Sequence, residues 1–148
     1  MLKSKYAVKQ ISVFLENRRG RLAEVAQALL EAEINIRALF LADSSEFGIL
    51  RMVVNNPEKA KAVLVSKGFA ANETNVFAVE VEDKPGGFYK VVKVLADEGI
   101  DVEYTYAYAG SSERAILFFK VKEEEFDKAV GALLNKGIKL VESLEMYK

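Results

Sequence analysis

The chain has 148 residues, 51% hydrophobic and 29% charged, and its 21 basic and 22 acidic residues leave a net charge of −1. This composition fits one or two small soluble domains, and without a basic excess to neutralise phosphates it argues against nucleic-acid binding. Cysteine and histidine are both absent, which excludes disulfides, thiolate nucleophiles, histidine bases and the commonest transition-metal ligands. No apolar run is long enough for a bilayer and no signal-peptide core is present, so we expect a cytoplasmic protein with no membrane partner.

The first part of the chain alternates between strand-like and helix-like patterns. Apolar residues occur at every second position from Ile11 to Leu15, then at helical spacing from Leu22 through Val25 and Ala26 to Leu29. The predicted elements are, in order, a strand over 11–15, a helix over 22–29, strands over 36–41 and 47–54 joined by a turn at 43–45, a helix from Pro57 to Gly68 and a strand over 69–74.

The second part repeats this order. The predicted elements are a strand over 77–82, a helix over 88–95, strands at about 102–109 and 114–121, a helix over 126–134 ended by Gly137, and a closing segment over 138–146. Residues 9–36 (KQISVFLENRRGRLAEVAQALLEAEINI) align without gaps on residues 75–102 (NVFAVEVEDKPGGFYKVVKVLADEGIDV), each matched pair lying 66 positions apart. Such self-similarity indicates two copies of one unit.

We therefore predict two domains, residues 8–74 and 75–148, each with the order βαββαβ. This is the ferredoxin-like or split-βαβ pattern of the α+β class, an antiparallel four-stranded sheet with both helices on one face. No Pro/Gly/Ser-rich linker separates the two units, since residues 70–76 pass from the last strand of one unit almost directly into the first strand of the next.

Two features of the predicted strands have open interpretations. Tyr104, Tyr106 and Tyr108 occupy alternate positions and so share a face, which is either an interface between units or chains, or an ordinary aromatic stripe. Arg51 lies among apolar strand residues. It could bind a ligand carboxylate bidentately, or pair with a nearby acid at the sheet edge.

Each unit has a glycine turn between its first strand and its first helix: ENRRGRL at 16–22 and EDKPGGF at 82–88. Glycine lets the backbone turn tightly and approach a ligand closely, and the helix that follows begins with unpaired N–H groups that suit a carboxylate or small anion. Asn17 and Asp83 could bind an ammonium group or cap the helix. A plain turn is the alternative, but recurrence in two diverged copies favours binding.

These turns, together with the matched segments NINI and GIDV around Asn35 and Asp101, resemble ACT domains. Over about 8–148 the chain is similar to small tandem ACT-domain proteins. The resemblance implies units that pair side by side and bind a free amino acid at their interface. The ligand-binding residues it implies are Asn17, Arg18, Arg19, Gly20, Arg21, Leu22 and Asn35 in the first unit, and Asp83, Lys84, Pro85, Gly86, Gly87, Phe88 and Asp101 in the second.

One departure from the family pattern concerns the first turn, where Arg19-Gly20 replaces the usual Pro-Gly. Either the first turn binds ligand differently, or only the second turn binds. The resemblance implies a non-catalytic regulatory or sensor protein without a cofactor, a homodimer that modulates a partner enzyme of amino-acid metabolism.

Two other functions remain open from the sequence. A structural protein–protein interaction module without a ligand is the stronger alternative, with the tyrosine stripe and sheet edges as docking surfaces. An acylphosphatase-like enzyme would need a phosphate-cradling arginine, which Arg18, Arg19 or Arg21 could supply. The second turn has no arginine, however, and no paired catalytic constellation accompanies the first, so we do not expect an enzyme.

Overall fold

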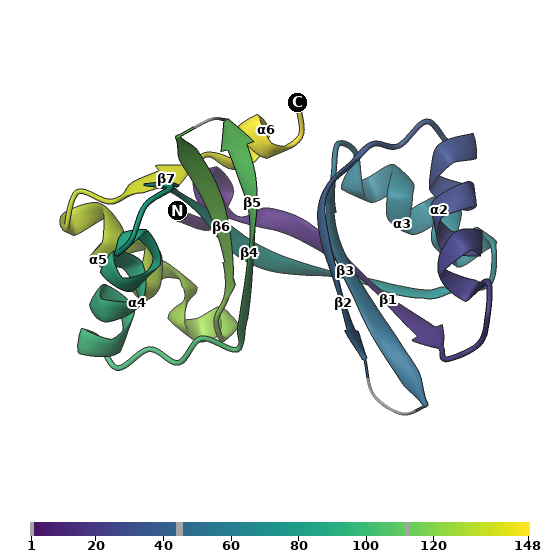
Figure 1. Cartoon of the computed structure of the whole chain (residues 1–148), viewed down its shortest axis with the longest axis horizontal. Helices are drawn as coiled ribbons and strands as arrows, with labels where there is room; N and C mark the ends of the chain where they lie inside the picture. Colours follow the sequence, from purple (N-terminus) through teal and green to yellow (C-terminus); the bar gives the residue numbers. More distant parts are fainter. Residues whose placement is uncertain (1, 44–45, 112) are drawn as a thin grey trace. The chain divides into compact units, whose positions relative to one another are not determined.

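The computed structural model describes residues 2–43, 46–111 and 113–148. They form two compact units (Figure 1). The first unit comprises Lys9–Thr74 with Met146–Lys148, and the second comprises Asn75–Glu145 with Met1–Val8. The N-terminal residues therefore belong to the unit built by the second half of the chain, and the C-terminal residues belong to the unit built by the first half.

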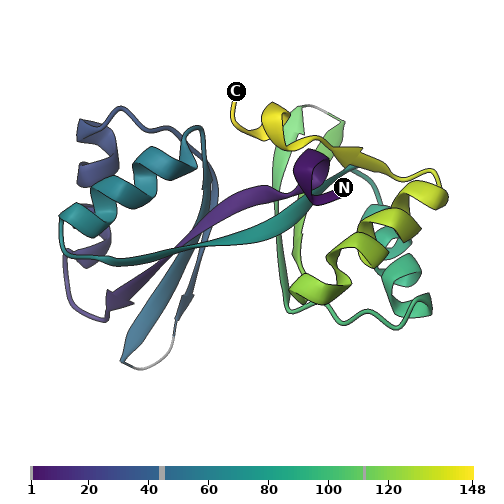
Figure 2. The ribbon, with the colours of Figure 1, turned by 180° about the vertical axis from the view of Figure 1, so that it is seen from behind.

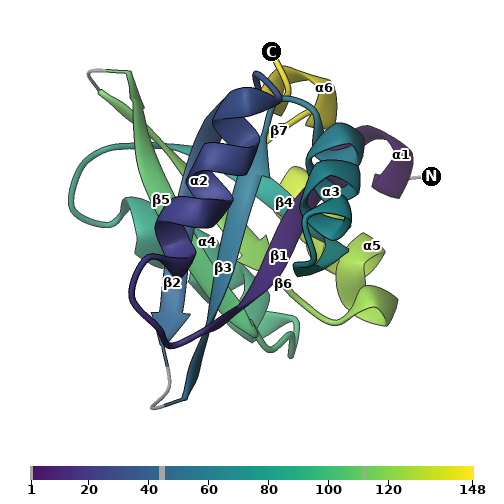
Figure 3. The same cartoon turned by 90° about the vertical axis from the view of Figure 1, so that its right-hand side faces the viewer.

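The first unit has the predicted ferredoxin-like architecture. Its elements are β1 (Val8–Glu16), α2 (Arg21–Glu31), β2 (Ile36–Asp43), β3 (Phe47–Val54), α3 (Pro57–Ser66) and the first part of β4 (Ala70–Glu82). The strand order is β2-β3-β1-β4, with β3 antiparallel to both β1 and β2. Both helices cover one face of this sheet (Figure 3). Ser44 and Ser45 of the predicted turn lie outside the described residues.

The second unit repeats the arrangement. Its elements are α1 (Leu2–Tyr6), the rest of β4, α4 (Gly87–Asp97), β5 (Tyr104–Ser111), β6 (Arg114–Lys120), the 3-10 helix η1 (Glu123–Glu125), α5 (Phe126–Asn135), β7 (Lys139–Val141) and α6 (Ser143–Met146). The strand order is β7-β4-β6-β5 and every pairing is antiparallel. The closing strand is shorter than the predicted 138–146, because the chain turns into α6 at Ser143.

Strand β4 serves as the last strand of the first unit and the first strand of the second. It runs without interruption over 13 residues, and in the first unit it lies beside β1 (Figure 2). Val76, Phe77, Ala78 and Val79 are all fully buried. Because successive side chains of a strand point to opposite faces, both faces of β4 are covered there. The sequence predicts two strands joined directly, and the structure merges them into one.

Each unit has its own apolar core between sheet and helices. Ile11, Val13 and Leu15 of β1 contribute to the first core, and the first helix adds Val25 and Leu29. The equivalent core of the second unit includes Phe77, Val79 and Val81 of β4 with Val91 and Leu95 of α4. Local apolar periodicity therefore places the sheet and helix faces of both units correctly.

The first helix of each unit buries a narrower stripe than its periodicity predicts. In α2, Val25, Ala28 and Leu29 are buried, whereas Leu22 is 46% exposed and Ala26 is also exposed. In α4, Phe88 is likewise exposed. These side chains flank the buried stripe at helical spacing. Leu22 and Ala26 extend the apolar surface of α2 beyond its buried stripe, whereas the Phe88 ring stacks on the Phe119 ring of β6 with centroids 6.1 Å apart.

The tyrosine stripe forms as predicted on one face of β5. Tyr106 lies opposite Phe118 and Tyr108 lies opposite Ile116 on β6. The Phe118 ring stacks on both tyrosine rings, with centroids 5.0 Å from Tyr106 and 6.0 Å from Tyr108. Since Phe119 belongs to the core, its neighbour Phe118 and the tyrosines lie on the sheet face away from the helices.

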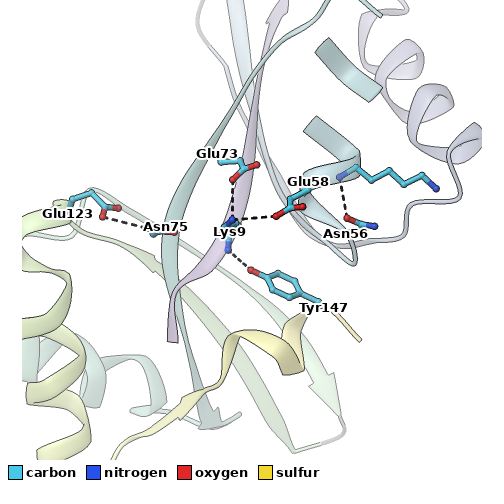
Figure 4. A network of polar contacts seen from close by, with 8 residues as sticks. Lys9, Asn56, Glu58, Glu73, Asn75, Glu123 and Tyr147 are labelled. Atoms are coloured by element: carbon cyan, nitrogen blue, oxygen red, sulfur yellow. Dashed lines mark hydrogen bonds and ion pairs between the residues drawn. The ribbon is translucent and has the colours of Figure 1, made fainter. Parts of the chain in front are cut away.

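The last residues of the chain are fixed within the first unit (Figure 4). The Lys9 N–H donates a hydrogen bond of 2.8 Å to the Tyr147 hydroxyl. Lys9 Nζ lies 3.7 Å from a Glu73 carboxylate oxygen and 3.9 Å from one of Glu58. Burial raises the pKa of the Tyr147 hydroxyl, so this hydroxyl stays protonated well above neutral pH.

None of the helices in the described ranges has the length and apolarity needed to cross a membrane.

Candidate functional site

The glycine turns of the two units share one backbone hydrogen-bond pattern. In the first turn, N–H groups donate from Arg18 to the Glu16 carbonyl (2.8 Å), from Arg21 to Arg18 (3.3 Å) and from Glu24 to Gly20 (3.0 Å). In the second turn they donate from Lys84 to Glu82 (2.9 Å), from Gly87 to Lys84 (3.1 Å) and from Lys90 to Gly86 (3.0 Å). Every donor and acceptor pair of one turn has its counterpart in the other, so the sequence repeat is also a repeat of local geometry.

A left-handed glycine ends each turn and begins the helix. Gly20 has φ 86° and ψ −9°, and Gly86 has φ 93° and ψ −11°. An L-residue adopts this conformation only with strain, which explains why both copies carry glycine at this position. Glycine offers no side-chain acceptor to the helix start, so neither N-cap residue competes with a ligand for the amides of the first helical turn.

Each turn is also tied to the hairpin that follows it in its unit. The Asn17 N–H donates to the Glu46 carbonyl at 2.9 Å, and the Asp83 N–H donates to the Glu113 carbonyl at 2.8 Å. These bonds hold the two candidate ammonium-binding residues at the same point of each unit, directly beyond the end of the first strand. Their side chains differ, because only Asp83 carries a negative charge.

Acidic residues within the first unit pair with two of the arginines in its turn. Arg18 lies 3.5 Å from Glu24 and 4.0 Å from Glu16. Arg21 lies 2.7 Å from Glu24 and 3.3 Å from Glu16, and its guanidinium carbon lies 4.1 Å from the centroid of the Phe69 ring. The hydrogen bond from Arg21 lowers the pKa of the Glu24 carboxyl. These pairs leave the first turn with less unbalanced positive charge than its sequence suggests.

The second turn approaches its strand more closely. A Cβ at Gly87 would lie 2.6 Å from the Glu82 carbonyl oxygen, which is too short for a real contact, so this position requires glycine. Lys84 Nζ lies 2.9 Å from a Glu82 carboxylate oxygen, and this hydrogen bond lowers the pKa of the Glu82 carboxyl. The Gly-Gly pair therefore permits a helix start that packs against the end of β4.

A pocket of about 330 Å³ lies beside the second turn, within the second unit. The turn contributes Lys84, Pro85, Gly86 and Gly87 to its lining, and Arg114 and Lys139 line it from β6 and β7. Both of these cations contact Glu80, Arg114 Nε at 3.0 Å and Lys139 Nζ at 3.2 Å from one carboxylate oxygen. Burial raises the pKa of the Glu80 carboxyl, but the hydrogen bonds and charges of Lys139 and Arg114 outweigh this effect and lower it.

Smaller recesses lie near the first turn. One of about 100 Å³ is lined by Asn17, Arg18, Arg21 and Leu22, with Gly48 from β3. Another of about 290 Å³ lies along α2. Four of the seven predicted ligand residues of the first unit thus line one small recess. Arg19, Gly20 and Asn35 do not line it.

Asn35 and Asp101 lie far from the turn of their own unit. Asn35 pairs with Asn55, its N–H donating to the Asn55 side-chain oxygen at 3.0 Å and its carbonyl accepting from the Asn55 N–H at 3.1 Å. Asn55 follows the end of β3, whereas Glu16 pairs with Phe47 at the start of β3. In the second unit, Asp101 precedes β5, which starts at Tyr104 and not at the predicted 102. The sequence repeat matches Asn35 with Asp101. Within each unit, however, this residue lies at one end of the strands and the glycine turn lies at the other end.

The chain can be placed in a family by comparison with known proteins. Residues 6–148 match the family model of the ACT domain pair. The chain belongs to this family. The structure of protein BT0572 from Bacteroides thetaiotaomicron is similar to it, with 36% sequence identity, a TM-score of 0.92 and coverage of 98% of this chain and 99% of that one. No curated protein sequence matches this ACT domain pair.

More distant structures share the fold of this ACT domain pair. The regulatory subunit of aspartate kinase from Thermus thermophilus, in its ligand-free form, has 19% identity and a TM-score of 0.65, with 88% of this chain and 93% of that chain covered. The corresponding subunit from Thermus flavus has 20% identity and a TM-score of 0.61, covering 88% and 92%. At these identities the similarity shows a common fold of two ACT units.

Sequence reasoning missed three cationic residues of the pocket beside the second turn of this ACT domain pair. Lys90, Arg114 and Lys139 line it together with the second turn. Two of them come from strands remote in sequence, so no local motif marks them. The repeat alignment could have drawn attention to Lys90, because the matched residue of the first unit, Glu24, has the opposite charge.

Arg51, for which the sequence left either ligand binding or an ion pair open, lies beside an aromatic ring. Its guanidinium carbon lies 5.6 Å from the centroid of the Phe40 ring on the neighbouring strand. This is within the range of a cation–π contact.

Among the described residues, no group of three or more acidic, cysteine or histidine side chains could hold a metal ion.

Proposed function

We propose that this ACT domain pair is a non-catalytic regulatory protein of the cytoplasm that binds a free amino acid between ACT units. The observation that carries the proposal is the glycine turn built twice with the same backbone hydrogen bonds and the same left-handed glycine. The same left-handed geometry in two diverged copies favours a shared binding role over a turn needed only for connectivity. Similarity of fold to regulatory subunits of aspartate kinase supports the same conclusion.

The turns offer complementary chemistry for both charged groups of an amino acid. Backbone N–H groups at the start of each helix and the basic residues of the turn suit the carboxylate. Asn17 or Asp83 would accept hydrogen bonds from the ammonium group. Asn35 and Asp101 occupy the opposite end of their own unit. They would therefore reach a ligand held by the turn of another unit, which is why we propose a site shared between units.

Regulation follows if the amino acid binds one arrangement of units more tightly than another. A ligand shifts an equilibrium only by its difference in affinity for the two states. We propose that the output is a partner enzyme of amino-acid metabolism, and that the chain itself is not an enzyme and needs no cofactor. The acid-paired Arg18 and Arg21 of the first turn do not favour an acylphosphatase-like role, because a phosphate would have to displace those acids.

The first prediction is a ligand-dependent gain in stability. Thermal unfolding of the purified chain is measured with each of the common amino acids. Ligand at about 100 times its Kd adds ~2.7 kcal/mol to the free energy of unfolding, which raises Tm by several degrees for a chain of this size. A shift with one amino acid or a related group identifies the ligand class. No shift with any of them contradicts the sensor function.

The same assay tests the residues that would hold the ligand. Asp101→Ala and Asp83→Ala should reduce the Tm shift caused by the ligand while leaving the Tm of the free protein nearly unchanged. Asn135→Ala, at the exposed end of α5, is a matched control and should leave the shift intact. If the free protein loses stability and the affinity does not change, the two residues have a structural role only.

Exposed leucines favour one alternative, a protein–protein interaction module without a ligand. Leu39 is 52% exposed and Leu41 is 45% exposed on β2, which is an edge strand of the first unit. Apolar side chains on an edge strand are typical of surfaces that pair with another chain. This alternative predicts partner binding with no response to any amino acid.

A further inference from the structure

One position of the repeat differs in a way that changes the shape of the two units. Arg21 is the first residue of α2, and the matched first residue of α4 is Gly87. In the first unit the Arg21 side chain is only 16% exposed, and its guanidinium stacks on Phe69. Phe69 follows the glycine that ends α3, as Ile138 follows the glycine that ends α5.

The matched space of the second unit is open. Gly87 has no side chain to cover Ile138, and both residues line the pocket of about 330 Å³. This volume lies at the lower end of the range of ligand sites, about 300–1,000 Å³, and suits a small molecule. In the first unit the corresponding recess has a volume of about 290 Å³, and the Arg21 guanidinium lines it.

The charges lining the two spaces also differ. The pocket of the second unit is lined by four cationic side chains, Lys84, Lys90, Arg114 and Lys139, and by two carboxylates, Glu80 and Glu82. Glu80 pairs with Arg114 and Lys139, and Glu82 pairs with Lys84. Lys90 forms no ion pair within the described parts of the chain. The pocket therefore keeps an excess of positive charge, with Lys90 available to a bound anion.

The matched recess along α2 has no such excess. It is lined by the cations Arg21 and Lys67 and by the carboxylates Glu24 and Glu31. Glu24 occupies the position of Lys90 and pairs with Arg21 at 2.7 Å. The charge at this position is thus reversed between the two units, and the guanidinium that could bind an anion in the first unit is already paired.

We propose that the pocket of the second unit binds a small molecule of net negative charge, an amino acid with an acidic side chain, and that the first unit has no equivalent site. One carboxylate of the ligand pairs with Lys90 and the other with Arg114, while Glu82 accepts from its ammonium group. The proposal rests on the proposed function, since it names the unit that binds and the class of amino acid.

The test is calorimetric titration of the full chain with aspartate and glutamate, with the neutral amides asparagine and glutamine, and with inorganic phosphate. We expect one acidic amino acid to bind per chain, and the amides to bind more weakly. Lys90→Glu gives the second unit the charge of the first, and should weaken acidic amino-acid binding by about tenfold or more, the effect of losing one charge-assisted contact.

Lys128→Glu is the matched control. It makes the same charge change on an exposed helical position of the same unit, outside the pocket lining, and should change affinity by less than about twofold, because exposed charges at a distance are screened. Thermal unfolding without ligand should be similar for both variants. This shows that each is folded.

Each remaining outcome overturns a defined part of the proposal. If neutral amino acids bind as tightly as acidic ones, or if Lys90→Glu binds normally, this inference fails while the amino-acid-binding function stands. If only phosphate binds, the pocket holds anions without recognising amino acids, and the ligand class is wrong. If none of these compounds binds, this inference fails, and the proposed function fails with it only when thermal unfolding also shows no shift with any of the common amino acids.

Discussion

Gly20 and Gly86 have the same backbone conformation, and this conformation is the main local constraint on the candidate site. A Cβ at either position would meet no atom within 4 Å. The cost of replacing these glycines therefore comes from the positive φ and not from a clash. Gly131 provides a contrast, because it lies within α5 and a Cβ there would make only an ordinary contact of 3.8 Å with Leu2.

We expect Gly86→Ala and Gly20→Ala each to lower the free energy of unfolding by about 1–2 kcal/mol, the cost of placing an L-residue in the left-handed region. Gly131→Ala should raise it by about 0.5–1 kcal/mol, because alanine loses less backbone entropy than glycine in a helix. Thermal unfolding of the three variants measures both effects. Equal stability of Gly86→Ala and Gly131→Ala would show that the turn tolerates a side chain.

At the scale of elements, strand β4 and its neighbour β1 are joined by a hydrogen bond between side chains as well as by their backbones. Gln10 is fully buried, and its side-chain nitrogen donates to the Thr74 hydroxyl at 3.0 Å. This is a hydrogen bond between side chains of two adjacent strands, and it lies where the first unit's part of β4 ends. A buried amide that loses an acceptor costs more than the net value of an ordinary hydrogen bond.

Thr74→Val, which keeps the shape of the side chain but removes its hydroxyl, should lower the free energy of unfolding by about 1–3 kcal/mol. The double variant Gln10→Leu with Thr74→Val should recover part of this loss, because it removes the buried amide that Thr74→Val leaves with one acceptor fewer. Urea unfolding of the single and double variants measures the coupling. Strict additivity of the two substitutions would mean that the bond contributes little.

For the molecule as a whole, the exposed edges of its sheets bear on assembly. Strand β2 ends the strand order on one side, and it exposes Leu39 and Leu41. Leu41 lines one recess together with the exposed Leu22 of α2. Unpaired edge strands with apolar side chains tend to pair with another chain, and closed symmetric dimers are the commonest result.

We therefore predict a homodimer in solution. Leu39→Glu should convert it to a monomer in light scattering, because a buried charge at an edge pairing is unfavourable. Leu144→Glu is the control, since Leu144 is 73% exposed on α6 and not on a sheet edge, and it should leave the mass unchanged. A monomeric mass for the unsubstituted chain, with and without amino acids, would rule out sites shared between chains.

The sequence by itself determined the local features of this protein. Alternation over Ile11 to Leu15 and the helical spacing that follows predict the first strand and helix correctly, because apolar side chains must face one core whatever the rest of the chain does. The match of Gly20 to Gly86 likewise predicts the recurring turn, since only glycine adopts its conformation without strain. These features depend on neighbours a few residues apart, and the same pattern occurs in both copies of the repeat.

The tertiary structure alone decided what depends on residues remote in sequence. Merging two predicted strands into β4, and grouping each chain end with the opposite unit, require pairings across the whole chain. The pocket needs the space left by Gly87 together with Arg114 and Lys139 from other strands. Periodicity reports which face of an element is apolar, but it carries no information on which distant charge lies beside it. The pocket that distinguishes the second ACT unit is therefore a property of the folded chain.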